Sequence, residues 1–188
     1  DDDQRRHVHR RQVGPTVGAI LREKAWLAIA WSMLTILVYV AVRFKHFDFG
    51  VAGVIALIHD VAVAAGGLCL LGRQIDMTVV AALLTIAGFS INDTIVIYDR
   101  VRENMRIHRK MGLAEVINLS VNQSLSRTLL TSLTVILQVL ALYFFGGEVL
   151  RDFSLCLLIG FVSGVYSTVY IASAIVVTWR RRFQPQRA

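Results

Sequence analysis

The sequence predicts an all-α, polytopic membrane protein whose spans pack as a helix bundle, and three observations predict it. Of the 188 residues, 55% are hydrophobic, whereas a soluble domain has roughly 45–50% apolar residues. Only 18% of the residues are charged, and they crowd between long stretches that hold almost no charge. Each stretch is as long as a membrane-spanning helix. This pattern excludes a soluble globule, a coiled coil and a disordered chain.

Five stretches have the length of about 20 helical residues that a hydrocarbon core about 30 Å thick requires. We expect spans over residues 25–42, 49–71, 77–98, 125–145 and 153–178. Together they predict one transmembrane bundle over residues 25–180, followed by a basic tail over 181–188. The last span contains a GxxxG from Gly160 to Gly164, and we expect these small residues to serve packing between helices rather than dimerisation.

The basic residues of the connections predict the orientation of the chain. With five spans, alternate connections lie on opposite sides of the membrane. One side has eleven Lys and Arg, in residues 43–48, 99–124 and 179–188. The opposite side has two in its short turns, residues 72–76 and 146–152. Because cytoplasmic loops carry the excess of Lys and Arg, the first side is predicted to be cytoplasmic, and the C-terminus with it.

The N-terminal segment, residues 1–24, departs from this rule because it holds six basic residues on the other side. It is too highly charged for a secretory signal. Since folded domains cross the membrane regardless of charge, we expect it to be the end of an extracytoplasmic domain. The net charge of +7 is attributed to cytoplasmic loops that face anionic lipid, because the basic residues flank the apolar spans. No nucleic-acid partner is expected.

The 99–124 connection is the one long internal loop, and it is predicted to be cytoplasmic. Its start alternates in charge, which suits a helix that continues out of the membrane. Residues 113–121 are amphipathic, and we expect them to lie along the membrane surface. Gly112 is predicted to separate the two helical parts.

Enzyme motifs do not occur in the sequence, which has no GxSxG, P-loop, GxGxxG or zinc signature. Cys69 and Cys156 lie in apolar stretches without CxxC spacing, so they are interpreted as buried, inert thiols. We therefore expect a protein that is not an enzyme and that needs no cofactor and no metal.

Asp60 lies midway along the second span, where a short carboxylate side chain cannot reach either interface. It must therefore find a donor inside the bundle or be protonated, and its sequence position leaves a functional and a structural role equally open. His59 precedes it and points about 100° away on a helix, so the two cannot bind one metal together. We interpret His59 as a packing histidine.

Asp93 in the third span and Arg127 in the fourth both fall in the cytoplasmic half, because the two helices are antiparallel. The sequence therefore predicts an ion pair between them. Burial and a neighbouring cation act in opposite senses on the proton affinity of a carboxyl group, which makes Asp93 a candidate proton carrier. Asn92 adds a polar group to the same turn. A static buried ion pair is the alternative.

Six segments, in order along the chain, carry a resemblance to a known family. They are VGPTVG at 13–18, IALIHD at 55–60, SINDTIV at 90–96, DRVREN at 99–104, NQSLSRTLLTS at 122–132 and FGGEVL at 145–150. Together they resemble the SecF family of protein-export membrane proteins, which belongs with the RND-type transporters. The resemblance covers almost the whole chain.

The resemblance implies a six-span subunit with an extracytoplasmic domain after the first span. Five spans would then be present here, with residues 1–12 as a remnant of that domain. It further implies that the proton motive force helps preproteins to complete export. Asp93 and Arg127 match the family's proton-pathway motifs, with Asn92 beside them. His59 and Asp60 match its "HD" motif, whose role is left less defined.

The partners implied by the resemblance are SecD, separate or fused, the SecYEG translocon, YajC, YidC, the preprotein and membrane lipid. The location implied is the cytoplasmic membrane of a bacterium or archaeon. Two alternatives stay open from the residues alone. One is an RND-type half-transporter for a small molecule or lipid, since a fold does not fix a function. The other is a structural subunit without proton traffic. An intramembrane hydrolase is disfavoured, because no catalytic constellation is recognisable.

Overall fold

Helices make up every regular element in the computed structural model, which describes residues 15–44 and 47–183. They are α1 (Pro15–Phe44), α2 (Phe47–Leu70), α3 (Met77–Ile107), α4 (Leu113–Phe145), α5 (Gly147–Tyr166), the π-helical segment η2 (Ser167–Ala172) and α6 (Ser173–Phe183). Five helical stretches are long and apolar enough to cross a membrane, and the last of them is the continuous run of α5, η2 and α6. The all-α membrane fold predicted from the sequence is therefore confirmed.

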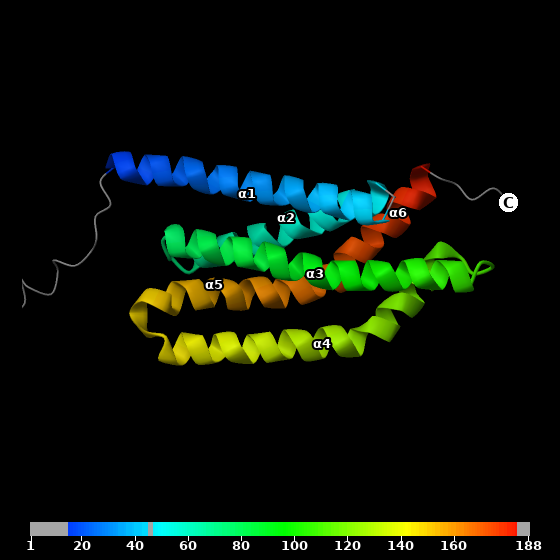
Figure 1. Cartoon of the computed structure of the whole chain (residues 1–188). Coiled ribbons are helices and arrows are strands. Elements are labelled where there is room, and N and C mark those ends of the chain that lie inside the picture. The colour runs from blue at the N-terminus through cyan, green and yellow to red at the C-terminus, as the bar shows by residue number, and fades with distance from the viewer. Residues whose placement is uncertain (1–14, 45–46, 184–188) are drawn as a thin grey trace, which may run out of the picture.

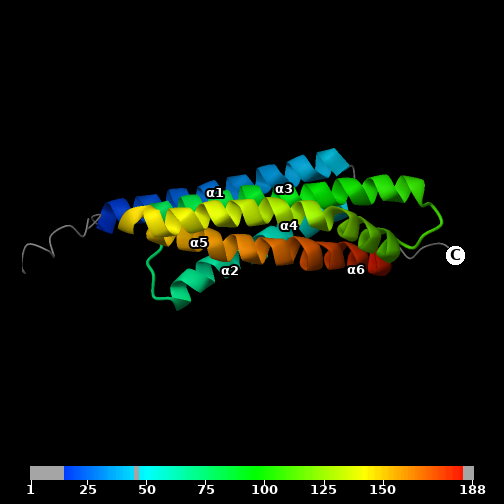
Figure 2. The same ribbon diagram turned by 90° about the horizontal axis from the view of Figure 1, so that it is seen from below.

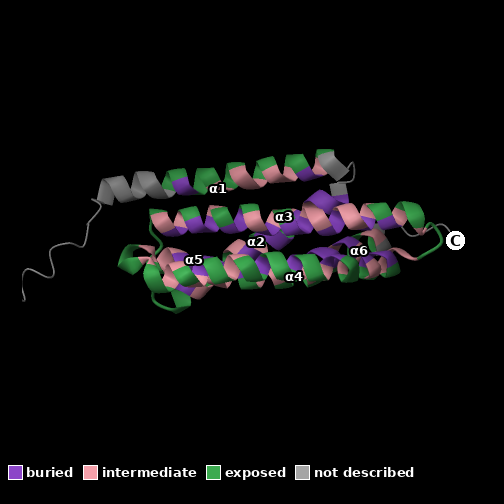
Figure 3. Cartoon of the chain, turned by 60° about the horizontal axis from the view of Figure 1, so that its bottom comes forward, coloured by how far each residue is buried: buried purple, intermediate pink, exposed green. Residues whose placement is uncertain are grey.

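The long helices lie side by side along one common direction, with α1 and α4 on opposite sides of the bundle (Figure 1). α5 packs against α2, α3 and α4, whereas α1 packs against α2 and α3. Buried residues gather on the inward faces, and the outward faces of α1 and α4 are mostly exposed (Figure 3). α3 and α5 are therefore the central helices, and they form the surroundings of any site inside the bundle.

The connections lie at opposite ends of the bundle in the two groups that five antiparallel spans predict (Figures 1 and 2). Two glycines with positive φ make the short turns at one end. Gly72 has φ +69° after α2, and Gly147 has φ +76° at the start of α5, directly after the α4–α5 turn. Both values fall in the left-handed region that glycine adopts without a steric penalty. Asp76 then starts α3, because its carboxylate accepts the backbone N–H of Val79 at 2.8 Å.

The 99–124 connection is almost entirely helical. α3 continues to Ile107, as its alternating charges predicted, and α4 begins directly after Gly112. Residues 113–121 form the first turns of α4 and are not a separate helix. Their apolar face is covered by protein, since Val116 and Ile117 are buried in one cluster with Val101 of α3.

Gly160 and Gly164 of α5 serve packing inside this chain, as predicted. A Cβ atom at Gly160 would overlap the side chain of Ile86 on α3. One at Gly164 would lie 3.7 Å from the carboxylate of Asp60 on α2. Cys156 is buried as expected, but Cys69 is exposed on α2, so the expectation of two buried thiols is wrong for Cys69.

The predicted remnant of an extracytoplasmic domain, residues 1–12, lies outside the described residues, as does most of the predicted basic tail. Arg180 belongs to α6 and forms an ion pair with Asp48 of α2, with 2.5 Å between Nε and Oδ2. Both side chains are mostly buried. The guanidinium also lies over the ring of Phe49, 5.1 Å from its centroid. These contacts attach the end of α6 to the start of α2.

Candidate functional site

Asp60 is fully buried, and helices α2, α3 and α5 all contribute to its surroundings. The hydroxyl of Ser90 on α3 donates to its Oδ2 at 2.5 Å. The hydroxyl of Ser163 on α5 donates to its Oδ1 at 3.3 Å. A carboxylate in an apolar interior needs such donors, because its hydration has been removed. Asp60 thus has the internal donors that its position in the span required.

His59 lies at the edge of this cluster, with 38% of its side chain exposed. Its Nδ1 atom is 3.2 Å from Oδ1 of Asp60. Neighbouring residues leave a helix about 100° apart, so the ring has to fold back along α2 to make this contact. His59 is therefore a polar neighbour of Asp60 that also reaches the outer surface of the bundle.

Asp93 lies on α3, one helical turn after Ser90, and it is 6% exposed. The hydroxyl of Ser132 on α4 donates to its Oδ2 at 3.4 Å, a long hydrogen bond. Residues three apart share one face of a helix, so Ser90 and Asp93 both point into the bundle. Asp93 is therefore a buried carboxyl group with weaker hydrogen bonding than Asp60.

A narrow crevice joins the surroundings of the two carboxyl groups. It is lined by Ser90 and Asp93 of α3 together with Gly160 and Gly164 of α5, and it has no room for a water-sized sphere. The two glycines let α5 approach α3 closely at this point. Ser90 thus contacts Asp60 and shares a crevice with Asp93, which places the two carboxyl groups in one polar region.

Arg127 and Asn92 are both exposed on the outer surface of the bundle. No ion pair joins Arg127 to Asp93 in the described part of the chain. Arg127 lies close enough for its charge to act on Asp93 electrostatically. The direct contact expected between them is therefore absent here. Asn92 lies on another face of α3 from Asp93, so it is outside the cluster that sequence proximity suggested.

The π-helical segment η2 brings further hydroxyl groups to the same region. The hydroxyl of Ser167 donates to the carbonyl of Ala56 on α2 at 3.3 Å. The hydroxyls of Thr168 and Thr94 are 3.3 Å apart, and Thr94 follows Asp93 on α3. π-helical turns within α-helices are often found at functional sites. The site therefore extends from α2 and α3 across the π-helical segment.

The hydroxyl groups of this site were not predicted from the sequence. Ser90, Ser132 and Ser163 hold the carboxylates, yet each lies in another span from the residue that it contacts. One available signal was the repeat of Ser or Thr at every fourth position of α4, from Ser120 to Ser132. A second was the position of Ser90, three residues before Asp93.

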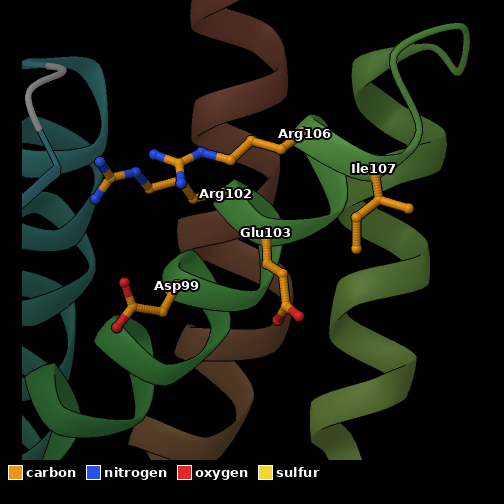
Figure 4. Close-up of a pocket in the computed structure, with 5 residues that line it drawn as sticks. All are labelled: Asp99, Arg102, Glu103, Arg106 and Ile107. Carbon is orange, nitrogen blue, oxygen red and sulfur yellow. The ribbon is translucent and has the colours of Figure 1, made fainter.

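A different cavity, of about 450 Å³, lies at the end of α3 and is lined by Asp99, Arg102, Glu103, Arg106 and Ile107. The guanidinium groups of Arg102 and Arg106 extend to the same side of the helix (Figure 4). It is open and contains neither buried carboxyl group, so it is a charged surface feature at one end of the bundle and not part of the intramembrane site.

A family model described as protein export membrane protein SecD/SecF, C-terminal, matches residues 2–182. The protein translocase subunit SecDF of Thermus thermophilus is 50% identical over 176 residues, which cover 94% of this chain and 24% of that protein. The protein translocase subunit SecF of Endomicrobium trichonymphae is 44% identical over 168 residues, which cover 89% of this chain and 54% of that protein.

Solved structures show the same helix arrangement. A crystal structure of SecDF from Thermus thermophilus, described as a translocon-associated membrane protein, matches with a TM-score of 0.86 and 50% identity, and covers 90% of this chain and 24% of that one. A crystal structure of SecDF in a super-membrane-facing form matches with a TM-score of 0.83 and 48% identity. This match covers 93% of this chain and 23% of that one. This chain thus spans 54% of the SecF relative named above and about a quarter of SecDF.

Proposed function

This chain belongs to the SecD/SecF family of protein-export membrane proteins, and on that premise we propose that it is a SecF-like, non-enzymatic subunit of the Sec protein-export machinery. It crosses the cytoplasmic membrane of a bacterium or archaeon several times, with its C-terminus in the cytoplasm. Its direct partner is SecD, and the complex acts on preproteins that leave the SecYEG translocon, with YajC and YidC as further partners. The family names and the five apolar helices support this assignment.

The proton motive force is proposed to drive this work through Asp93. The observation that carries the proposal is a carboxyl group that is 6% exposed in the middle of an apolar bundle, with one long hydrogen bond from Ser132. Such a group is costly in a membrane and usually marks an ion or proton pathway. Asp93 takes up a proton from one side of the membrane, and this neutralises its attraction to Arg127.

The remaining polar residues are assigned supporting roles in the same pathway. Ser90 links Asp60 to the region of Asp93, and His59 gives Asp60 a contact with the bundle surface. Asn92 and Arg127 face outward, where we expect the helices of SecD to meet this chain. A change in the charge of Asp93 then alters the packing of the helices, and the motion reaches the extracytoplasmic domain that handles the preprotein.

The experiment is Asp93→Asn in the intact SecD/SecF complex, in inverted membrane vesicles that export a preprotein. Export is measured with a proton motive force and after an uncoupler has collapsed it. We expect the variant to lose the proton-dependent part of export and Asp152→Asn to retain it, because Asp152 lies near the α4–α5 turn, paired with Arg73. Wild-type proton dependence in Asp93→Asn would show that the carrier is elsewhere.

The same vesicles test the alternative, an RND-type half-transporter for a small molecule or lipid. That function predicts that vesicles without this subunit export the preprotein at the wild-type rate at every proton gradient. If the chain is an export subunit, vesicles without it lose proton-dependent export of the preprotein, and reintroducing the wild-type chain restores it.

A further inference from the structure

One face of α4 carries a buried hydroxyl group at every turn. Ser120, Ser124, Thr128 and Ser132 are spaced by four residues, and each of the four is 6% exposed or less. Residues four apart lie on one face of a helix, and α4 packs against α3 and α5. The outward face of the same helix is apolar, and Leu129, Leu130 and Leu133 are about half exposed there. We call the four residues the hydroxyl row.

The hydroxyl row runs from the charged end of the bundle to Asp93. At one end, Nδ2 of Asn104 on α3 donates to Oγ of Ser120 and to Oε1 of Gln123, at 2.9 Å each. Gln123 is exposed and also accepts from Arg100 at 2.7 Å. At the other end, Ser132 donates to Asp93. Twelve residues of helix rise about 18 Å, slightly more than half of a hydrocarbon core about 30 Å thick.

The hydrogen bonds of the row differ from those of a simple packing face. Buried Ser and Thr in helices usually donate to a carbonyl of their own helix. Ser120 does so, to Val116 at 2.7 Å, and so does the exposed Thr134, to Thr131 at 2.7 Å. Within the described part of the chain, Oγ1 of Thr128 is fully buried and has no hydrogen-bond partner. A buried hydroxyl without a partner is costly and calls for a ligand or a specific role.

We propose that the hydroxyl row is the route by which water from the cytoplasmic end reaches Asp93. The ligand is water, held by the hydroxyls of Ser124 and Thr128, each of which can both donate and accept a hydrogen bond. The row is closed in this structure and opens when α4 moves away from α3. The proton of the Asp93 carboxyl group then passes to this water and leaves as hydronium, and a carboxylate remains. Among the charged groups, Asp93 accepts from Ser132 at one end of the row, Arg100 of α3 donates to Gln123 beside the other end, and Arg127 precedes Thr128 on α4.

This inference rests on the proposed role of Asp93, but its test does not need proton transport. In the intact complex, Cys69 and Cys156 are replaced by alanine, and single cysteines are introduced as Ser124→Cys or Thr128→Cys. A small cationic methanethiosulfonate that does not cross membranes is added from the cytoplasmic side. Leu133→Cys, on the outward face of the same helix, is the matched control.

We expect the thiols at 124 and 128 to react several-fold faster than the thiol at 133, because only they line a route that admits water. We also expect an imposed proton gradient to change the rate at 128 and not at 133. If the thiols at 124 and 128 stay as unreactive as the control, with and without a gradient, the row is a dry packing face and the inference is wrong.

A second measurement uses the hydroxyls themselves. Thr128→Val keeps the shape of the side chain and removes the hydroxyl, and Thr134→Val makes the same change on the exposed face. We expect Thr128→Val to slow proton-dependent export several-fold and Thr134→Val to leave it unchanged. Loss of export in Asp93→Asn together with normal export in Thr128→Val would overturn the route alone. Normal export in Asp93→Asn would overturn the proposed function, and the thiol rates would still decide whether water enters the row.

Discussion

The hydroxyl of Ser90 on α3 donates to the carboxylate of Asp60 on α2 at 2.5 Å, in the middle of the bundle. Ser90 also lines the same crevice as Asp93, one turn further along α3. One small side chain is therefore adjacent to both Asp60 and Asp93. Any change in the position of α3 relative to α2 alters the surroundings of both groups together.

Ser90→Ala is expected to lower the stability of the complex by about 1–3 kcal/mol, because it leaves a fully buried carboxyl group without its shortest hydrogen bond. The measurement is the midpoint of thermal unfolding of the purified complex in detergent. Ser126→Ala, on the exposed face of α4, is the control. An equal midpoint for the two variants would mean that the Ser90 hydrogen bond contributes nothing to stability.

Arg127→Lys is expected to retain most proton-dependent export, and Arg127→Gln to lose it. The reason is that Arg127 makes no direct ion pair with Asp93 in the described structure, and we propose that it acts through its charge. A lysine keeps the positive charge, but it cannot form the two parallel hydrogen bonds of a bidentate guanidinium contact. Export in vesicles measures the effect. Equal loss in both variants would indicate that a direct guanidinium contact forms in another state.

Gly160→Ala is expected to destabilise the bundle by about 1–3 kcal/mol, because its Cβ would overlap Ile86 and force the two central helices apart. Gly164→Ala should cost less, since its Cβ would meet only ordinary contacts at 3.7 Å. Thermal unfolding compares the two. The addition of Ile86→Val to Gly160→Ala should recover part of the loss. If stability is not recovered, the contact with Ile86 is not the cause of the destabilisation.

Asp48→Asn and Arg180→Gln are each expected to destabilise the protein by about 3 kcal/mol, because each leaves a mostly buried charge without its partner. The double variant should cost less than the sum of the two single variants, since no unpaired charge remains. A double-mutant cycle on unfolding midpoints gives the coupling. Additive effects would show that the two residues act independently.

The sequence predicted the five spans because each needs only a long apolar run, and it placed Asp60 correctly at the centre of its span. It could not predict how each helix is rotated about its axis. Lipid is as apolar as the interior of the bundle, so hydrophobic periodicity does not tell an inward face from an outward one. Arg127 and Cys69 were misjudged for this reason, because both turn outward.

The second limit on prediction from the sequence is that contacts between distant segments leave no local pattern. Ser90 and Asp60 are thirty residues apart, and Ser163 and Asp60 more than a hundred, so nothing local indicates their hydrogen bonds. The fold-back of the His59 ring onto its neighbour depends on a rotamer that helical spacing does not fix. The hydroxyl repeat of α4 and the spacing of Ser90 and Asp93 on α3 were the signals in the sequence that could have oriented these helices.

The π-helical turn at Ser167–Ala172 sets the register of everything after it. Its hydrogen bonds enclose one residue more than those of an α-turn, so each residue of α6 lies about 100° short of the position that an unbroken α-helix would give it. That offset aims Arg180 at Asp48. If all six residues of this segment formed an ordinary α-helix instead, the last span would keep its apolar composition, yet the Arg180 side chain would rotate away from Asp48 toward the surrounding lipid.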